Sequence, residues 1–335
     1  MFDRLLVWLY PEGGRTWIRW VVAAILLYLL GAVVIGIYWS GEPDGFDPQQ
    51  SAKAAAAKFN QNVVPGYTTT HTLIHVAEEV LDKPGGYLSN DVFPPGVWLD
   101  NTRSWEFGAV VQIRDMARAL RKDFSRSQSQ SREQPDLAKA EPQFSFAADS
   151  WMLPSTESQY REGVGDLYTY LGKLSNPTNG NAEFYGRADN LSNWLGDVST
   201  RLGSLSQRLS ASVGQRVVNS DGDENPQTSS TSEVKTPWLE IDNVFYEARG
   251  TTWALLEFLR AVEVDFGPAL AKKNALVSLR QVIRELEGTQ ETVWSPVILN
   301  GSGFGLFANH SLVMANYISR ANAAIIDLRE LLARG

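Results

Sequence analysis

Residues 188–210 read ADNLSNWLGDVSTRLGSLSQRLS, with apolar side chains that recur at alternating spacings of three and four. Because an α-helix turns once in about 3.6 residues, this spacing puts the apolar side chains on one helical face. Strict alternation, the sign of a half-buried strand, is not convincing anywhere in the chain. The sequence therefore predicts an all-α fold, a multi-helix bundle. The same helical rhythm recurs at 110–124, 160–174, 248–266, 276–286 and 318–332.

The segment 155–213 holds two of these helical stretches, separated by SNPTNGN at 175–181. Pro, Gly and Asn in such a cluster end helices and favour a compact turn. We therefore expect 155–213 to form a long antiparallel helical hairpin. A coiled coil between separate chains would use the same leucines and is the alternative interpretation.

A polar segment at 218–236 divides the helical stretches. Within it, NSDGDENPQTSSTSEVKT contains almost no apolar residue and is punctuated by Gly and Pro. Such a segment buries too little surface to order itself, so we expect a flexible linker. The linker separates a first helical region, 40–217, from a second helical region, 237–335. The sequence is compatible with one joined body or with two.

Residues 21–39, VVAAILLYLLGAVVIGIYW, contain no charge. As a helix they are about 29 Å long, close to the roughly 30 Å hydrocarbon core of a bilayer, which predicts one transmembrane helix. A secretory signal peptide is the alternative, but the apolar run is longer than a typical signal core and lacks a good cleavage site. Three arginines precede the run, whereas Lys53 is the one basic residue shortly after it. This bias predicts that the tail, 1–20, is cytoplasmic.

The chain is acidic, with a net charge of −8 over 335 residues. Residues 1–39 hold three arginines and two acids, which leaves 27 basic and 36 acidic residues, net −9, in the rest. An acidic domain repels nucleic acid, so we expect no nucleic-acid partner. The chain contains no cysteine. Disulfides, thiolate catalysis and cysteine-based zinc sites are therefore excluded.

The stretch HTLIHVAEEV at 71–80 suggests a possible metal site. His71 and His75 lie one helical turn apart and Glu79 continues their face, so three ligands could converge. The zincin motif, however, needs Glu directly after the first His, and that position is Thr72. The simpler interpretation is a His75–Glu79 contact on a helix surface.

Two further motifs have structural explanations. NGSGFGLF at 300–307 lacks the Lys-Ser/Thr end of a phosphate loop, and we expect a tight connection into the last helix. His310-Ser311 lacks an acidic partner, and we expect Ser311 to take part in capping that helix. Seven tryptophans follow the anchor, and we expect mainly core and loop-packing roles, with stacking on a cell-wall glycan as the alternative. They are Trp98, Trp105, Trp151, Trp194, Trp238, Trp253 and Trp294.

At VFPPGVWLDN (92–101), at 241–266 and above all at SPVILNGSGFGLFANHSLVMANYISRANAAIIDL (295–328), the chain resembles a proteobacterial family known as domain of unknown function 2333. The resemblance covers most of the chain, the anchor included. It implies a bacterial inner-membrane protein whose C-terminal domain faces the periplasm. Since the family has no established activity, the resemblance carries over no catalytic residue and no cofactor.

We expect a non-enzymatic, membrane-tethered scaffold or assembly protein that binds protein partners or copies of itself. The motivating features are one anchor and strong helical stripes without a catalytic constellation. Ala32 and Gly36 form a small-xxx-small pair in the anchor that would let two anchors approach. The alternatives are a metal-dependent envelope hydrolase that uses His71 and His75, and a cell-wall glycan-binding protein.

Overall fold

The computed structural model describes residues 16–127, 132–176, 181–219, 230–295, 297–302 and 305–334. Within these ranges the chain forms eleven α-helices and two short strands, so the predicted all-α class is confirmed. In chain order the α-helices and strands are α2 (Thr16–Trp39), α3 (Pro48–Phe59), α4 (Tyr67–Asp82), α5 (Asp100–Ala119), α6 (Pro135–Phe144), α7 (Thr156–Leu174), α8 (Ala188–Ser210), β1 (Gln215–Asn219), β2 (Ser230–Val234), α9 (Ile241–Asp265), α10 (Gly267–Lys272), α11 (Leu276–Glu287) and α12 (His310–Ala333). Short helical turns are η1 (Gly96–Trp98), η2 (Leu120–Phe124), η3 (Ala211–Val213), η4 (Trp238–Glu240) and η5 (Gly288–Gln290).

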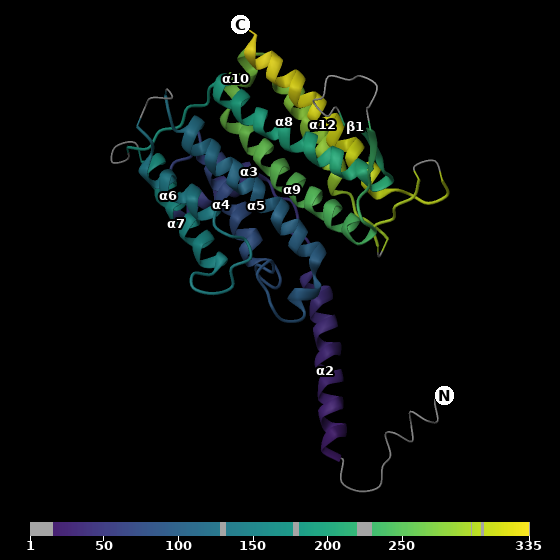
Figure 1. Ribbon diagram of the computed structural model, residues 1–335. Helices are drawn as coiled ribbons and strands as arrows, with labels where there is room; N and C mark the ends of the chain where they lie inside the picture. The colour runs from purple at the N-terminus through teal and green to yellow at the C-terminus, as the bar shows by residue number, and fades with distance from the viewer. Residues whose placement is uncertain are drawn as a thin grey trace.

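The helix α2 projects away from the body formed by the other helices (Figure 1). Its most apolar part has a mean hydropathy of 2.7, and the helix is long enough to cross a membrane. Length and composition of this kind fit a membrane anchor or a signal sequence. Residues 1–15 of the predicted tail lie outside the described residues.

The helices α5 and α9 form the centre of the body and run in the same direction. Trp105, near the start of α5, contacts Trp253, in the middle of α9, at a ring-centroid distance of 5.0 Å. Phe124 contacts Phe266 beyond the ends of both helices at 4.9 Å. The two backbones touch where the helices cross, because a Cβ added to Gly250 would lie 2.0 Å from the Trp105 carbonyl oxygen. A glycine is required there for the close approach.

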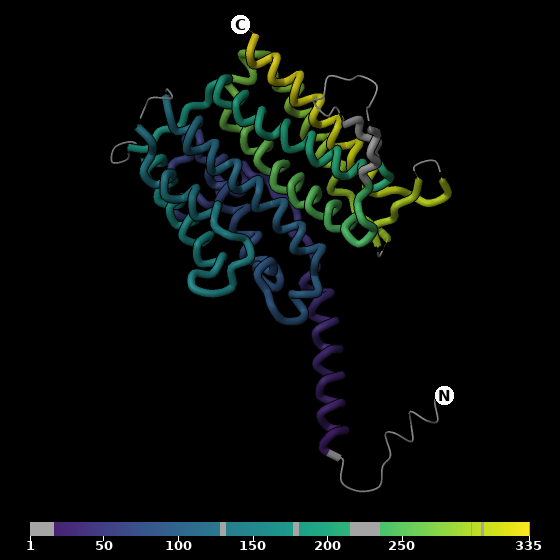
Figure 2. Tube along the Cα trace, viewed as in Figure 1, coloured from purple at the N-terminus to yellow at the C-terminus, as the bar shows by residue number. Residues whose placement is uncertain are grey.

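One continuous hydrophobic core joins the first and second helical regions. The apolar stripe of α8 is fully buried, with Leu191, Leu195 and Leu202 at 0% exposure. This stripe packs mainly against α12, from the far end of the chain, and the two helices are antiparallel. Figure 2 shows α12 lying along α8 over most of its length. The predicted boundary at 218–236 therefore falls between two segments that share their core.

The expected hairpin of 155–213 takes a different form. The helix α7 packs on α4 and on α6, where Phe144 contacts Tyr160, while α8 packs on α12. The antiparallel hairpin is thus α6–α7, and the breaker after α7 leads to another part of the molecule. The physical reason is that an apolar stripe must be buried, but its spacing does not determine which helix buries it. For α8, the complementary stripe of α12 is longer than that of α7.

The polar segment 218–236 is also not structureless throughout. Its ends take part in an antiparallel hairpin in which Gln215 pairs with Val234 and Asn219 with Ser230. A backbone bond from Thr236 N to Ala211 O, 3.0 Å, closes the hairpin base. The sequence predicts no strand here, because a two-stranded ribbon pairs its backbone groups without the buried alternating face that marks a strand. Residues 220–229 of the expected linker lie outside the described residues.

The N-terminus of α4 is capped by a residue from α9. The N-cap position, Gly66, has no side chain to do so. Instead the Asp265 carboxylate accepts hydrogen bonds from the backbone N and from Oγ1 of Thr69, both at 2.7 Å. The acceptor and donor are 196 residues apart, so this contact ties the two helical regions together.

Candidate functional site

The predicted metal candidates all lie on α4, and the structure does not bring them to one point. His71 is buried, and its Nε2 lies 3.1 Å from the carbonyl oxygen of Ser51 on α3. His75 Nε2 lies 3.8 Å from Glu79 Oε1, and the His75 ring contacts Phe46 edge-on. The part of the chain that the structure describes contains no group of three His, Asp or Glu placed to hold a metal ion.

Burial, with the charge of His75 as a second cause, lowers the pKa of His71 to about 4. The side chain is therefore neutral at pH 7 and acts as a hydrogen-bonding part of the α3–α4 contact. This geometry matches the simpler interpretation of the histidine pair, a surface contact plus packing.

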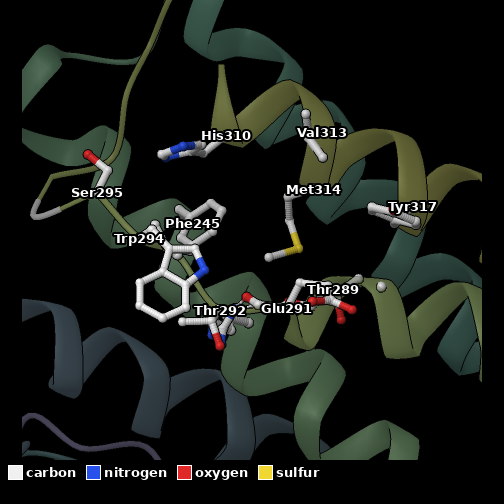
Figure 3. A pocket seen from close by; sticks show the side chains of 13 residues that line it. Phe245, Thr289, Glu291, Thr292, Trp294, Ser295, His310, Val313, Met314 and Tyr317 are labelled. Atoms are coloured by element: carbon white, nitrogen blue, oxygen red, sulfur yellow. Dashed lines mark hydrogen bonds between the residues drawn. The ribbon is translucent and has the colours of Figure 1, made fainter. Parts of the chain in front are cut away.

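A pocket of about 530 Å³ opens between the first turns of α9, η5 and the start of α12. Phe245, Trp294, Met314 and His310 lie around the same space (Figure 3). Met314 is 4% exposed, whereas Trp294, at the pocket edge, is 92% exposed. The pocket is thus an apolar hollow with a large aromatic ring left in water beside it, the arrangement expected of a binding site.

Arg249 holds one wall of this pocket. Its Nε lies 2.6 Å from Glu42 Oε2, and its other nitrogens donate to the carbonyl oxygens of Thr289, Gln290 and Glu291 at 2.7–3.2 Å. Arg249 is buried, and its charge is neutralised by the Glu42 carboxylate. Arg249 therefore fixes the η5 wall against the segment that follows α2, and it does not act as a free cation for a ligand.

His310 supplies polarity at the pocket. Its Nδ1 accepts a hydrogen bond from the Leu299 backbone N at 3.2 Å, which places the proton of the neutral ring on Nε2. Partial burial lowers the pKa of His310. The ring lies 6.4 Å from that of Phe245. A neutral imidazole beside aromatic and aliphatic side chains suits an apolar ligand better than an anion.

The loop residues 301, 302 and 305–308 lie next to the pocket, where 305–308 line a hollow that shares Val313 with it. Asn309 Nδ2 donates to Asn300 Oδ1 and to Gly301 O, at 2.8 and 2.6 Å, and closes the loop base. The loop exposes Leu306 and Phe307, at 101% and 74%. A tight connection into the last helix was predicted here. The structure shows a closed base at Asn300, Gly301 and Asn309, and the exposure of Leu306 and Phe307 was not predicted.

The helix α12 begins at His310, as the sequence indicates, but its cap is not Ser311. The Asn309 side chain accepts from the Leu312 N at 2.8 Å and provides the cap. Ser311 is 1% exposed, and its Oγ has no hydrogen-bond partner within the described part of the chain. The capping prediction for Ser311 is therefore wrong, because Asn309 holds the N-cap position and Ser311 points into the core. Its hydroxyl also lacks the base that a nucleophile needs.

The sequence predicts mainly core and loop-packing roles for the tryptophans, and three of the seven lie in the core. Trp105, Trp194 and Trp253 are buried. The remaining four are exposed to 48–92%: Trp98, Trp151, Trp238 and Trp294. Trp294 lies at the pocket, and Trp238 lies in η4, directly before the helix that carries Phe245. Composition reveals how many tryptophans a chain has, whereas their exposure depends on which loops the fold leaves at its surface.

Sequence reasoning missed the pocket itself. Phe245 and Met314 belong to helices with apolar stripes and look like ordinary core residues, and Trp294 lies in an irregular segment without periodicity. The weak signal was the density of apolar residues in 292–307, a stretch of sequence without helical periodicity, because a simple connection does not require so many.

Residues 11–335 match the sequence model of a family described as an uncharacterized protein conserved in bacteria, domain of unknown function 2333, and the chain belongs to that family. Neither a curated protein nor a solved structure matches the chain.

Proposed function

We propose that this member of an uncharacterised bacterial family is a membrane-tethered scaffold or assembly protein that acts by binding other proteins and has no enzymatic activity. In this proposal α2 spans the inner membrane, residues 1–20 face the cytoplasm and the helical body lies in the periplasm. The arginines before the span and the acidic body after it support that orientation.

The observation that carries the proposal is the apolar pocket with its exposed surroundings. Trp294, Leu306 and Phe307 leave large apolar surfaces in water beside a hollow lined by Phe245 and Met314. Exposed apolar groups around a hollow are typical of interaction sites, because burying their surface against a partner is energetically favourable. Val313, which lines both the pocket and the hollow under the 305–309 loop, joins the two parts.

The chemistry of the pocket favours a protein segment as its occupant. The volume of about 530 Å³ accommodates one or two large apolar side chains of a partner. The Arg249 charge is already neutralised by Glu42, so an anionic ligand gains little there. A binding segment with Leu, Phe or Met anchors, packed between Trp294 and Met314, would fill the site.

Site-specific photocrosslinking in living cells tests this function. A photoreactive amino acid at position 294 should yield a discrete adduct with one protein of defined mass. The matched control is position 277, where Val277 is 78% exposed on α11 and away from the pocket. Val313→Glu, which places a carboxylate at the pocket edge, should remove the adduct at 294. Equal adducts at 294 and 277, or a monodisperse monomer after purification in mild detergent, would contradict the proposal.

Glycan binding is the second candidate function, favoured by the exposure of Trp238 and Trp294. Flat aromatic rings in water are suited to stacking on sugars. Sedimentation with purified cell wall distinguishes the two candidates, because Trp294→Ala should abolish co-sedimentation only if the glycan is the ligand.

A further inference from the structure

The loop between α4 and α5 descends along the side of α2. The Tyr28 hydroxyl donates to the Pro94 carbonyl oxygen at 3.1 Å. A Cβ added to Gly36 would lie 3.4 Å from Pro95 Cβ. Between these two contacts Ala32 is only 4% exposed, whereas Val34 on the open side of the helix is 61% exposed. The small pair Ala32 and Gly36 therefore accommodates this loop, and the face predicted to pair two anchors is already covered.

These contacts fix the depth of the loop relative to the end of α2 at Trp39. Tyr28 precedes Trp39 by eleven residues, about 16 Å along the helix, and Gly36 precedes it by three, about 5 Å. Even after allowance for the length of the tyrosine side chain, Pro94 lies well below the end of the helix. The loop is thus beside a part of α2 that a bilayer must surround if α2 spans it.

The loop carries apolar side chains that the protein does not cover. Val92 is 48% exposed, Phe93 74%, Val97 39% and Trp98 48%. Part of its backbone is paired within the protein and needs no water there. Pro94 and Pro95 have no N–H group, Tyr28 occupies the Pro94 oxygen, and the N–H groups of Val97 and Trp98 bond within the loop. A segment in hydrocarbon must meet this requirement.

A second apolar loop, between α6 and α7, lies on the same side of the body. Trp151, Met152 and Leu153 are exposed to 57%, 55% and 98%. Trp151 lines one pocket of about 320 Å³ together with Trp39 and Phe93, so the two loops meet at the exit of α2. In Figure 2 both turns lie on the side of the body from which α2 leaves.

Buried polar contacts hold the two loops in place. Lys83 Nζ lies 2.7 Å from Glu106 Oε1, and both side chains are almost fully buried. The same carboxylate accepts from the Leu88 N at 2.8 Å. Asn90 Nδ2 donates to the Ser150 carbonyl oxygen at 2.9 Å and ties one loop to the other. The exposed apolar residues of the two loops are therefore held in fixed positions on the body.

We propose that residues 92–98 and 151–153 form a membrane-docking platform that inserts its apolar side chains into the outer leaflet of the bilayer that α2 spans. The inference rests on the proposed membrane anchor. The bilayer is the occupant because residues 92–98 lie at the depth of the span, so whatever surrounds the exposed face of α2 also surrounds Phe93. Trp98 and Trp151 have the amphipathic rings that favour the membrane interface. The platform fixes the orientation of the periplasmic body on the membrane.

Spin labels on the full chain in lipid nanodiscs with one copy per disc test the platform. The chain contains no cysteine, so single substitutions label cleanly. The test variants are Phe93→Cys and Leu153→Cys, both at exposed positions. The positive control is Val34→Cys in α2, and the aqueous control is Leu306→Cys, as exposed as Leu153 but far along the chain near the candidate pocket. Accessibility to oxygen, which concentrates in lipid, is compared with accessibility to a water-soluble nickel chelate.

Labels at 93 and 153 should relax faster with oxygen than with nickel, as at 34, and the label at 306 should show the opposite order. Nickel accessibility at 93 and 153 equal to that at 306, with 34 still protected, would overturn the platform and leave the anchor intact. Nickel accessibility at 34 as well would overturn both. Protection that appears only in discs with several copies would show that a second copy covers these loops, and would also overturn the inference.

Discussion

Gly108 and Gly250 allow the backbones of α5 and α9 to touch at the centre of the body. A Cβ at Gly250 would lie 2.0 Å from the Trp105 oxygen, and one at Gly108 would lie 2.1 Å from the Glu247 oxygen. The obstacles are backbone atoms, which move only if the helices separate. Both helices carry Asp-Asn in their first turn, Asp100-Asn101 in α5 and Asp242-Asn243 in α9.

Gly250→Ala is therefore expected to destabilise the protein by about 1–3 kcal/mol or more through overpacking, despite the gain in helix propensity. Gly165→Ala on α7 is the control, since a Cβ there meets nothing within 4 Å. That control should be neutral or stabilising by up to about 1 kcal/mol. Urea denaturation of the detergent-solubilised chain measures both. Equal stability of the two variants would show that the helices can separate without cost.

His71 makes the stability of the protein depend on pH. Its pKa is about 4 in the folded chain, below the ordinary value of 6.5. As pH falls from 6.5 to 4 the unfolded chain binds the proton more readily, so this contribution to stability falls, by about 3 kcal/mol in total. His71→Gln keeps a donor for the Ser51 oxygen and does not titrate. The free energy of unfolding of wild type minus variant should decrease across this window.

The quantity to measure is the difference in the free energy of unfolding between wild type and His71→Gln. Other buried groups change the stability with pH in the opposite direction, so the wild-type value alone does not isolate His71. Burial raises the pKa of Glu257 to about 7 and that of Asp265 to about 6. The stability these carboxyl groups contribute is present at low pH and is lost as pH rises through those values. Both contributions cancel in the difference between wild type and His71→Gln. A difference that stays constant from pH 6.5 to 4 would refute the assignment to His71.

At the level of elements, Asp265 of α9 caps the N-terminus of α4. This contact explains how α4 can begin after Gly66, which has no side chain to cap it. Asp265→Ala leaves the Thr69 amide without its acceptor and should cost about 2 kcal/mol. Asp265→Asn keeps an acceptor oxygen and should cost less. Hydrogen exchange at the Thr69 amide gives a local readout, with faster exchange expected in the alanine variant. Asp242→Ala, which removes a bond only to the neighbouring Asn243 amide, should leave that exchange rate unchanged.

The elements also show what the sequence can and cannot predict. The apolar stripes of α8 and α12 could be predicted from the sequence, because helical periodicity indicates that one face of a helix is buried. Their pairing could not, because it depends on every other apolar face in the molecule, and α8 meets a helix more than a hundred residues later. Trp294 and Phe307 carried no periodic signal for the pocket, since irregular segments have no period. The covering of Gly36 by Pro95 likewise depends on a distant loop.

At the scale of the whole molecule, the shared core predicts that the two helical regions behave as one cooperative unit. The stripe of α8 in the first region has α12 as its main cover, and Asp265 of the second region caps α4 of the first. A first region without its partner would expose a row of leucines to water. The predicted boundary at 218–236 is then a covalent connection between two segments that depend on each other for folding.

A protease site inserted into 220–229 of the full chain tests this dependence. After cleavage the two pieces should stay associated in detergent and unfold in one transition, because the α8–α12 contact buries apolar surface along two long helices. Ile325→Asp, at a fully buried position of α12, should release the C-terminal piece. Ile326→Asp, its neighbour at 45% exposure, should leave the pieces together. Separation of the wild-type pieces into two independently folded domains would show that the shared core adds little to the stability of either region.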